Sequence, residues 1–188
     1  ELVSAFARES KLKTALETVQ GKYDYIIIDC PPSLGLLTVN SLNAAHSYII
    51  PMQTEYFAME GLSQLMNTVR LIRNSLNPAL KMEGILLTMV VARNNLSKQV
   101  TEEIRKHFKE DVFKIAIPRN VKLSESPSFG KPIILYDIGS TGSHAYFNLA
   151  KEILLKDKER FEKKSPNIQD LKKTKGSIPS FEDYDGLS

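Results

Sequence analysis

The order of hydrophobic and polar positions alternates between two patterns over most of the chain. In one pattern apolar residues recur at roughly the 3.6-residue helical period, which predicts helices with one buried face. In the other, short continuous apolar runs predict strands that are buried on both faces of a parallel sheet. The predicted helices span residues 2–20, 36–45, 58–76, 97–108 and 142–155, and the predicted strands span 23–28, 47–51, 84–91 and 112–117.

Strands that alternate with helices in this way indicate βαβ units, in which each crossover helix packs on the sheet. We therefore expect an α/β fold with a parallel, doubly wound sheet that carries helices on both faces. The chain begins at Glu1, inside the first predicted helix, and not at methionine. We accordingly expect the sheet to be incomplete at its N-terminal side.

Composition is ordinary for a folded domain, with 42% hydrophobic and 25% charged residues in 188. This composition excludes a wholly disordered chain. A disulfide scaffold is excluded because Cys30 is the single cysteine. No apolar run is long enough to span a bilayer. We expect a cytoplasmic protein with no membrane partner, whose net charge of +3 permits an anionic one.

The end of the chain differs from the rest. Residues 151–175 are rich in lysine and arginine, the last residues are acidic, and apolar positions become sparse. We expect a folded domain over 1–164 and a flexible charged tail over 165–188. A solvated tail is the simpler interpretation, and a basic arm that touches DNA is the alternative.

Asp29 is the strongest candidate for chemistry. It directly follows an apolar run, which places it at the carboxyl edge of a parallel sheet, where open α/β folds bind ligands. In nucleotide-binding folds of the P-loop type this position holds Mg²⁺, usually through water. Pro31 and Pro32 stiffen the chain after it, and Gly35 lets the chain turn back. The alternative is an aspartate that only caps the next helix.

Several longer motifs follow in a fixed order. They are D-C-P-P-S-L-G at 29–35, E-Y-F-A-M-E-G at 55–61, A-R-N-N-L-S-K-Q-V at 92–100 and I-P-R-N-V-K-L-S-E-S-P-S at 117–128. In this order and at this spacing they resemble the ParA/Soj family of chromosome and plasmid partition ATPases, over about residues 1–155. The resemblance implies a P-loop-NTPase-like sheet, ATP and Mg²⁺ as cofactors, and a catalytic, metal-holding role for Asp29.

The resemblance also implies partners. They are a second copy in a nucleotide-sandwich dimer, non-specific double-stranded DNA in the nucleoid, and a ParB/Spo0J-type partition protein that stimulates hydrolysis. Two other functions stay open, a partition-related binding module without turnover and a MinD-like division-site ATPase. The family's phosphate-binding loop, K-G-G-x-G-K-T-T, does not occur in these 188 residues. We therefore expect that this chain alone does not hydrolyse ATP.

Two further groups of residues take their roles from the resemblance. Pro118, Arg119 and Asn120 are expected to border the adenine base, the alternative being a proline-terminated strand followed by a solvent-facing arginine. Arg93 and Lys122 are expected to contact DNA phosphates, the alternative being ordinary surface cations. Family members often carry arginine at the position of Lys122, and lysine keeps the charge but loses the bidentate geometry.

Overall fold

The computed structural model describes residues 6–31, 33, 35–55 and 58–164. The chain divides into two compact units, Glu1–Leu149 and Ala150–Ser188, and helix α7 (Thr141–Lys164) crosses their boundary. The predicted tail at 165–188 lies outside the described residues, so the domain boundary at 164 stays a prediction. None of the described helices is long and apolar enough to cross a membrane.

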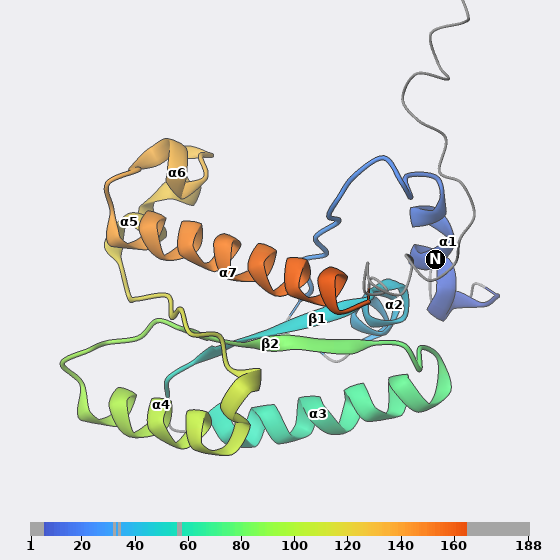
Figure 1. Cartoon of the computed structure of the whole chain (residues 1–188), viewed down its shortest axis with the longest axis horizontal. Coiled ribbons are helices and arrows are strands. Elements are labelled where there is room, and N and C mark those ends of the chain that lie inside the picture. The colour runs from blue at the N-terminus through green and yellow to red at the C-terminus, as the bar shows by residue number, and fades with distance from the viewer. Residues whose placement is uncertain (1–5, 32, 34, 56–57, 165–188) are drawn as a thin grey trace, which may run out of the picture. The chain divides into compact units, whose positions relative to one another are not determined.

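The sheet of the first unit is parallel, as predicted. Strand β1 (Ser47–Gln53) pairs with strand β2 (Lys81–Thr88), and helix α3 (Ala58–Ser75) connects them (Figure 1). The ladder contains a bulge, because Tyr48 pairs with Met82 whereas Ile49 pairs with Gly84. A parallel pair with a helical crossover is the βαβ unit that the hydrophobic pattern indicates. The predicted α/β fold class is thus confirmed.

The segment 112–118 lies parallel to β2 on its other side, after helix α4 (Asn95–Phe108) and the short 3₁₀ turn η3 (Lys109–Asp111). Phe113 N donates to Ile85 O at 3.0 Å, and Ile117 N donates to Leu87 O at 2.8 Å. Only isolated bridges form, so the segment is not a regular strand. The prediction placed this segment correctly and overestimated its regularity.

The strand predicted at 23–28 is wrong. No strand forms there, and the side chains are open to solvent, with Tyr23 67% and Ile27 92% exposed. A strand needs a neighbour that accepts and donates its backbone hydrogen bonds. Within the described residues, β1 pairs with β2 alone and no strand lies against 23–28.

The first predicted helix is shorter in the structure. It consists of the 3₁₀ turn η2 (Arg8–Ser10) and helix α1 (Lys11–Glu17), and its predicted start at residues 2–5 lies outside the described part of the chain. None of the residues of these two elements is buried. Without a buried face, helical periodicity alone gives little stability to so short a helix.

The main hydrophobic core lies between the strands and helices α3 and α4, which run along one side of the two strands (Figure 1). Burial is continuous over the middle of β2 but alternates along β1, where Ile50 and Met52 are buried and Ile49 is 38% exposed. The predicted burial of both faces therefore holds for β2 and not for β1. The core residues are Ile50, Met52, Leu62, Ile85, Leu87, Val100, Ile104 and Val112.

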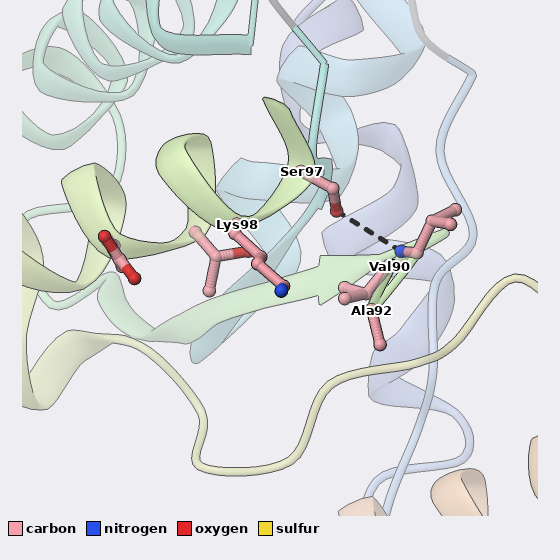
Figure 2. Close-up of a pocket in the computed structure, with 7 residues that line it drawn as sticks. Val90, Ala92, Ser97 and Lys98 are labelled. Carbon is pink, nitrogen blue, oxygen red and sulfur yellow. Dashed lines mark hydrogen bonds between the residues drawn. The ribbon is translucent and has the colours of Figure 1, made fainter. Parts of the chain in front are cut away.

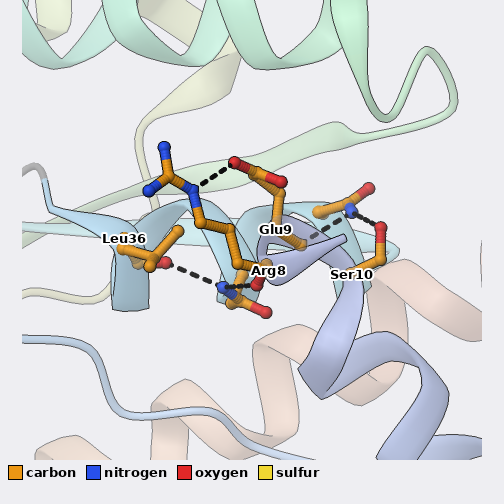
Figure 3. A network of polar contacts seen from close by, with 6 residues as sticks. Arg8, Glu9, Ser10 and Leu36 are labelled. Atoms are coloured by element: carbon orange, nitrogen blue, oxygen red, sulfur yellow. Dashed lines mark hydrogen bonds and ion pairs between the residues drawn. The ribbon is translucent and has the colours of Figure 1, made fainter. Parts of the chain in front are cut away.

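Helix α2 (Leu36–Ala44) is tied to the N-terminal elements by two buried asparagines (Figure 3). Asn40 Nδ2 donates to Arg8 O at 2.8 Å and to Leu36 O at 3.0 Å, and its Oδ1 accepts from Leu12 N at 3.2 Å. Asn43 Nδ2 donates to the carbonyl of Glu9 at 2.9 Å. These amides satisfy backbone groups at the ends of η2 and α1, which have no helical partner.

A third asparagine caps the other end of α2 and yields a stability prediction. Asn77 Nδ2 donates to the carbonyls of Leu42 at 2.9 Å, Asn43 at 3.3 Å and Ala45 at 2.8 Å. Asn77→Ala leaves these carbonyls without that donor and should lower the free energy of unfolding by about 1 to 2 kcal/mol. Urea denaturation measures this change. Asn74→Ala, at an exposed position of α3, is the matched control and should be nearly neutral; equal losses in both variants would contradict the capping role.

Three short elements that the pattern did not predict lie between the segment 112–118 and α7. They are helix α5 (Val121–Glu125), the 3₁₀ turn η4 (Ser126–Phe129) and helix α6 (Ile133–Tyr136). Each is too short to show a helical period in the sequence. α5 contacts both η4 and α6, and together they carry one side of the candidate site.

Candidate functional site

Two loops meet at the carboxyl end of β2. Val90 N donates to Ile117 O at 3.1 Å, and Arg119 N donates back to Val90 O at 3.1 Å. This pairing brings the turn that carries Arg93 next to the turn that carries Arg119. Both arginine side chains are exposed. Two predicted site residues from distant parts of the sequence therefore lie on neighbouring loops at one edge of the sheet.

Each of these arginines is followed by an asparagine that caps a helix. Asn94 Oδ1 accepts from Leu96 N at 2.9 Å at the start of α4, and Asn120 Oδ1 accepts from Lys122 N at 2.9 Å at the start of α5. Capping by asparagine fixes the backbone where a helix begins. The repeated Arg-Asn pair thus holds both arginine backbones firmly while their side chains reach solvent.

Helix α5 is held against the start of α7 by two contacts. Asn120 Nδ2 donates to Thr141 Oγ1 at 2.7 Å. A Cβ atom at Gly142 would lie 2.5 Å from Cγ of Leu123, so only glycine permits this close approach. Both polar atoms of the Asn120 amide therefore make structural hydrogen bonds: Oδ1 accepts from Lys122 N, and Nδ2 donates to Thr141 Oγ1. The contact of Asn120 with an adenine base stays a prediction, as do those of the half-buried Pro118 and the exposed Arg119.

Lys122 is exposed but already engaged. Its Nζ atom lies 2.9 Å from Glu125 Oε2, in an ion pair three residues apart on α5, and 5.7 Å from the centre of the Tyr136 ring. The Tyr136 hydroxyl donates to the same Glu125 oxygen at 2.9 Å. The Glu125 carboxylate raises the pKa of Lys122, and the hydrogen bonds from Lys122 and Tyr136 lower the pKa of Glu125.

Glu125 and Tyr136 were absent from the predicted site. The spacing of Lys122 and Glu125 was visible in the sequence, because residues three apart on a helix are neighbours. No spacing in the sequence indicated Tyr136, because only the folded position of α6 brings it next to Glu125. Its ring stacks on Phe129 with centroids 5.0 Å apart, which fixes the hydroxyl beside Glu125.

Comparison with known proteins decides the family. The chain is 61% identical over 153 residues to the sporulation initiation inhibitor protein Soj of Bacillus subtilis, a match of 81% of this chain and 60% of that protein. It is 59% identical over 157 residues to the chromosome partitioning protein ParA of Myxococcus xanthus, a match of 84% of this chain and 56% of that protein. The chain belongs to the ParA/Soj family. It spans less than two thirds of the length of these ParA/Soj relatives.

A family model and solved structures also match the chain. A family model described as an AAA domain matches residues 1–82. The crystal structure of cobyrinic acid a,c-diamide synthase from Mycobacterium smegmatis is similar with a TM-score of 0.66 and 35% identity, over 81% of this chain and 56% of that one. A second structure of the same enzyme, with a bound ATP analog and magnesium, has a TM-score of 0.58 at 34% identity, over 69% of this chain and 58% of that one.

No described strand precedes Asp29, so its predicted position at the carboxyl edge of the sheet is wrong, and its role as a magnesium ligand stays a prediction. Its carboxylate is exposed, and no other described residue forms a hydrogen bond or ion pair with it. Within the described part of the chain no cluster of three or more metal-ligating side chains occurs. Mg²⁺ usually keeps several waters and takes one or two carboxylates together with substrate phosphates. A single exposed carboxylate within a loop therefore suits magnesium better than a tightly caged metal.

The loop after Asp29 is tied to α2, since the Thr38 hydroxyl donates to Ser33 O at 2.6 Å. Pro32 of this loop lies outside the described residues. The structure does not join Asp29 to the arginine-bearing loops by any hydrogen bond or ion pair among described residues.

A pocket of about 150 Å³ lies beside the Arg93 loop, between the end of β2 and the first turns of α4 (Figure 2). The Ser97 hydroxyl at its border accepts from Val91 N at 3.2 Å and lies 2.7 Å from the Thr54 hydroxyl. These bonds fasten the first turn of α4 to the ends of both strands. The pocket is lined by Val90, Val91, Ala92, Ser97, Lys98, Thr101 and Glu102.

Proposed function

We propose that the full-length protein is a partition ATPase that binds DNA without sequence preference. In this proposal it binds ATP and Mg²⁺, pairs with a second copy across the nucleotide, and is stimulated to hydrolyse ATP by a ParB/Spo0J-type partner. The names of the relatives, a chromosome partitioning ParA and a Soj protein, support the partition role. The phosphate-binding loop that hydrolysis requires is not among these 188 residues, so the proposal concerns the full-length protein.

The observation that carries the DNA-binding part is the placement of the cations. Arg93 extends from an asparagine-capped loop, and Lys122 lies on the first turn of α5, which follows the adjacent asparagine-capped loop. Cations on a firmly held edge suit a row of backbone phosphates. Phosphate contacts position a protein on DNA but carry no sequence information. We therefore expect affinity that depends strongly on salt and little on sequence.

The ATPase part has its own support. The structurally similar synthase, at 34% identity, holds an ATP analog and magnesium. In the present chain Asp29 would hold magnesium through water, and Pro118, Arg119 and Asn120 would border the base. Magnesium, when bound, neutralises charge on the phosphates during phosphoryl transfer. Asp29 itself contributes a charged oxygen on an exposed loop whose far end is fastened to α2.

The DNA-binding proposal is tested by removing its two cations. Arg93→Ala and Lys122→Ala should each weaken binding of the ATP-bound full-length protein, equally on two unrelated duplexes. Each lost phosphate contact should reduce the slope of log K against log salt by about 0.9, or twice that if both subunits engage. A salt titration followed by fluorescence anisotropy measures affinity and slope together, with dimerisation checked separately.

Lys106→Ala is the matched control. Lys106 is an exposed cation in the last turn of α4, at the opposite end of that helix from Arg93. Its removal changes the net charge by the same amount as the removal of Arg93 or Lys122. It should leave the salt slope unchanged. A double variant Arg93→Ala/Lys122→Ala that keeps the parent affinity and slope would remove this edge from the DNA-binding surface.

A further inference from the structure

The cation proposed to meet DNA is already paired with a carboxylate. Lys122 Nζ and the Tyr136 hydroxyl both donate to Glu125 Oε2, each at 2.9 Å. A carboxylate oxygen that accepts from an ammonium group occupies the position that a phosphate oxygen would take. The side chains of Lys122 and Glu125 are 46% and 38% exposed, so the pair is open to a competing anion.

The surroundings hold the carboxylate in place. The Tyr136 ring stacks on Phe129, and its hydroxyl is thereby directed at Glu125. The same ring lies 5.7 Å from the Lys122 ammonium group, within the range of a cation–π contact. Asp137, next in sequence, adds a second negative charge that favours the charged form of Lys122. Lys122 is thus retained by a hydrogen bond, an aromatic face and a nearby acidic residue.

We propose that Glu125 acts as an internal competitor of the DNA phosphate for Lys122, so that it limits the affinity of the DNA-binding edge. This inference rests on the proposed DNA-binding function and names a residue that tunes it. When a phosphate takes the ammonium group, the pair must open, and the Glu125 carboxylate then lies close to the DNA. Both effects oppose binding. Arg93 has no such carboxylate among its described contacts, so the restraint falls on one of the two cations.

The proposal predicts that removing the carboxylate strengthens binding. Glu125→Gln keeps the size of the side chain and an oxygen that can accept from Tyr136, but it lacks the charge that holds Lys122. DNA affinity of the ATP-bound full-length protein should rise about twofold to fivefold, the range expected for opening an exposed ion pair. The salt slope should stay close to that of the parent, because Lys122 already contacts a phosphate and Glu125→Gln strengthens this contact without adding another.

Two comparisons separate this effect from a general change of charge. Glu110→Gln removes one exposed carboxylate from η3 and is the charge-matched control, with an expected effect well below that of Glu125→Gln. Glu125→Gln placed on top of Lys122→Ala should no longer raise the affinity, because the cation that it releases is absent.

Each outcome is informative. Glu125→Gln that matches Glu110→Gln in affinity and slope would overturn the inference while leaving the DNA-binding proposal intact. An equal gain from Glu125→Gln with and without Lys122 would also overturn it, since Glu125 would then repel DNA directly. If Lys122→Ala alone changes neither affinity nor slope, the assignment of Lys122 to the DNA surface fails, and the inference fails with it.

Discussion

Asp29→Ala is expected to lower ATP hydrolysis by the full-length protein about 100-fold, the usual cost of removing one electrostatic group aimed at the reacting phosphates. The substitution removes the carboxylate that would hold magnesium. The side chain is exposed and makes no hydrogen bond with other described residues, so the fold should be unaffected. Steady-state hydrolysis measures the loss, and an unchanged thermal melting curve separates chemistry from folding.

Asp24→Ala is the control for this prediction. Asp24 is exposed in the same segment, five positions earlier, and its removal changes the net charge by the same amount. It should leave hydrolysis near the parent rate. If Asp29→Ala hydrolyses ATP as fast as Asp24→Ala does, Asp29 has a local structural role only, and the predicted metal position is wrong.

Gly84→Ala is expected to give the largest loss of stability, about 2 to 3 kcal/mol in the free energy of unfolding, as overpacking of a filled core does. A Cβ atom at Gly84 would lie 2.8 Å from Cε2 of Phe113 and 3.1 Å from the carbonyl oxygen of Asp111. Phe113 is fully buried and cannot move aside. Gly84 therefore allows the segment after η3 to approach β2, which in turn positions the Arg119 loop.

The control is a glycine with open space around it. Gly61 lies on the exposed face of α3, and a Cβ atom there would meet nothing within 4 Å. Gly61→Ala should raise the free energy of unfolding by about 0.5 to 1 kcal/mol, because alanine is the better helix former. Urea denaturation of both variants tests for opposite signs. A Gly84→Ala variant that is as stable as the parent would show that Phe113 does not fill this space.

The elements that could be predicted are those with a long, regular pattern. Helices α3 and α4 were predicted to within two residues at each end, because their apolar positions repeat over several turns. The predicted strand at 84–91 was displaced by three residues from β2. Its apolar run continues into Val90 and Val91, which lie beyond the ladder with β1. Val90 bonds to Ile117 and Arg119 instead.

The errors have a common physical cause. Apolarity at 23–28 indicates what a segment would bury, but it does not say which neighbour provides the hydrogen bonds of a strand. Helices α5 and α6 could not be found from periodicity, since four or five residues do not complete two turns. Asn94 before α4 and Asn120 before α5 are capping signals that the sequence prediction did not use.

The sequence predicted which residues belong to the candidate site, but it did not predict the contacts between them. Exposure of Arg93, Arg119 and Lys122 follows from their charge and their position in loops. Their proximity depends on the backbone bonds between Val90 and the Arg119 turn, which no local pattern encodes. The three-residue spacing of Lys122 and Glu125 indicated that they could pair on a helix. The contact of Tyr136 with Glu125 could be recognised only in the structure.

The central claim is that the full-length protein binds DNA in an ATP-dependent and sequence-independent way. It is tested most directly by fluorescence anisotropy on two unrelated duplexes of equal length, with Mg-ATP, with Mg-ADP and without nucleotide. Tight binding is expected with Mg-ATP but not with Mg-ADP or without nucleotide, and with the same affinity for both duplexes. Binding that does not depend on nucleotide would favour a DNA-binding module without turnover, and a preference for one duplex would contradict a phosphate-reading edge.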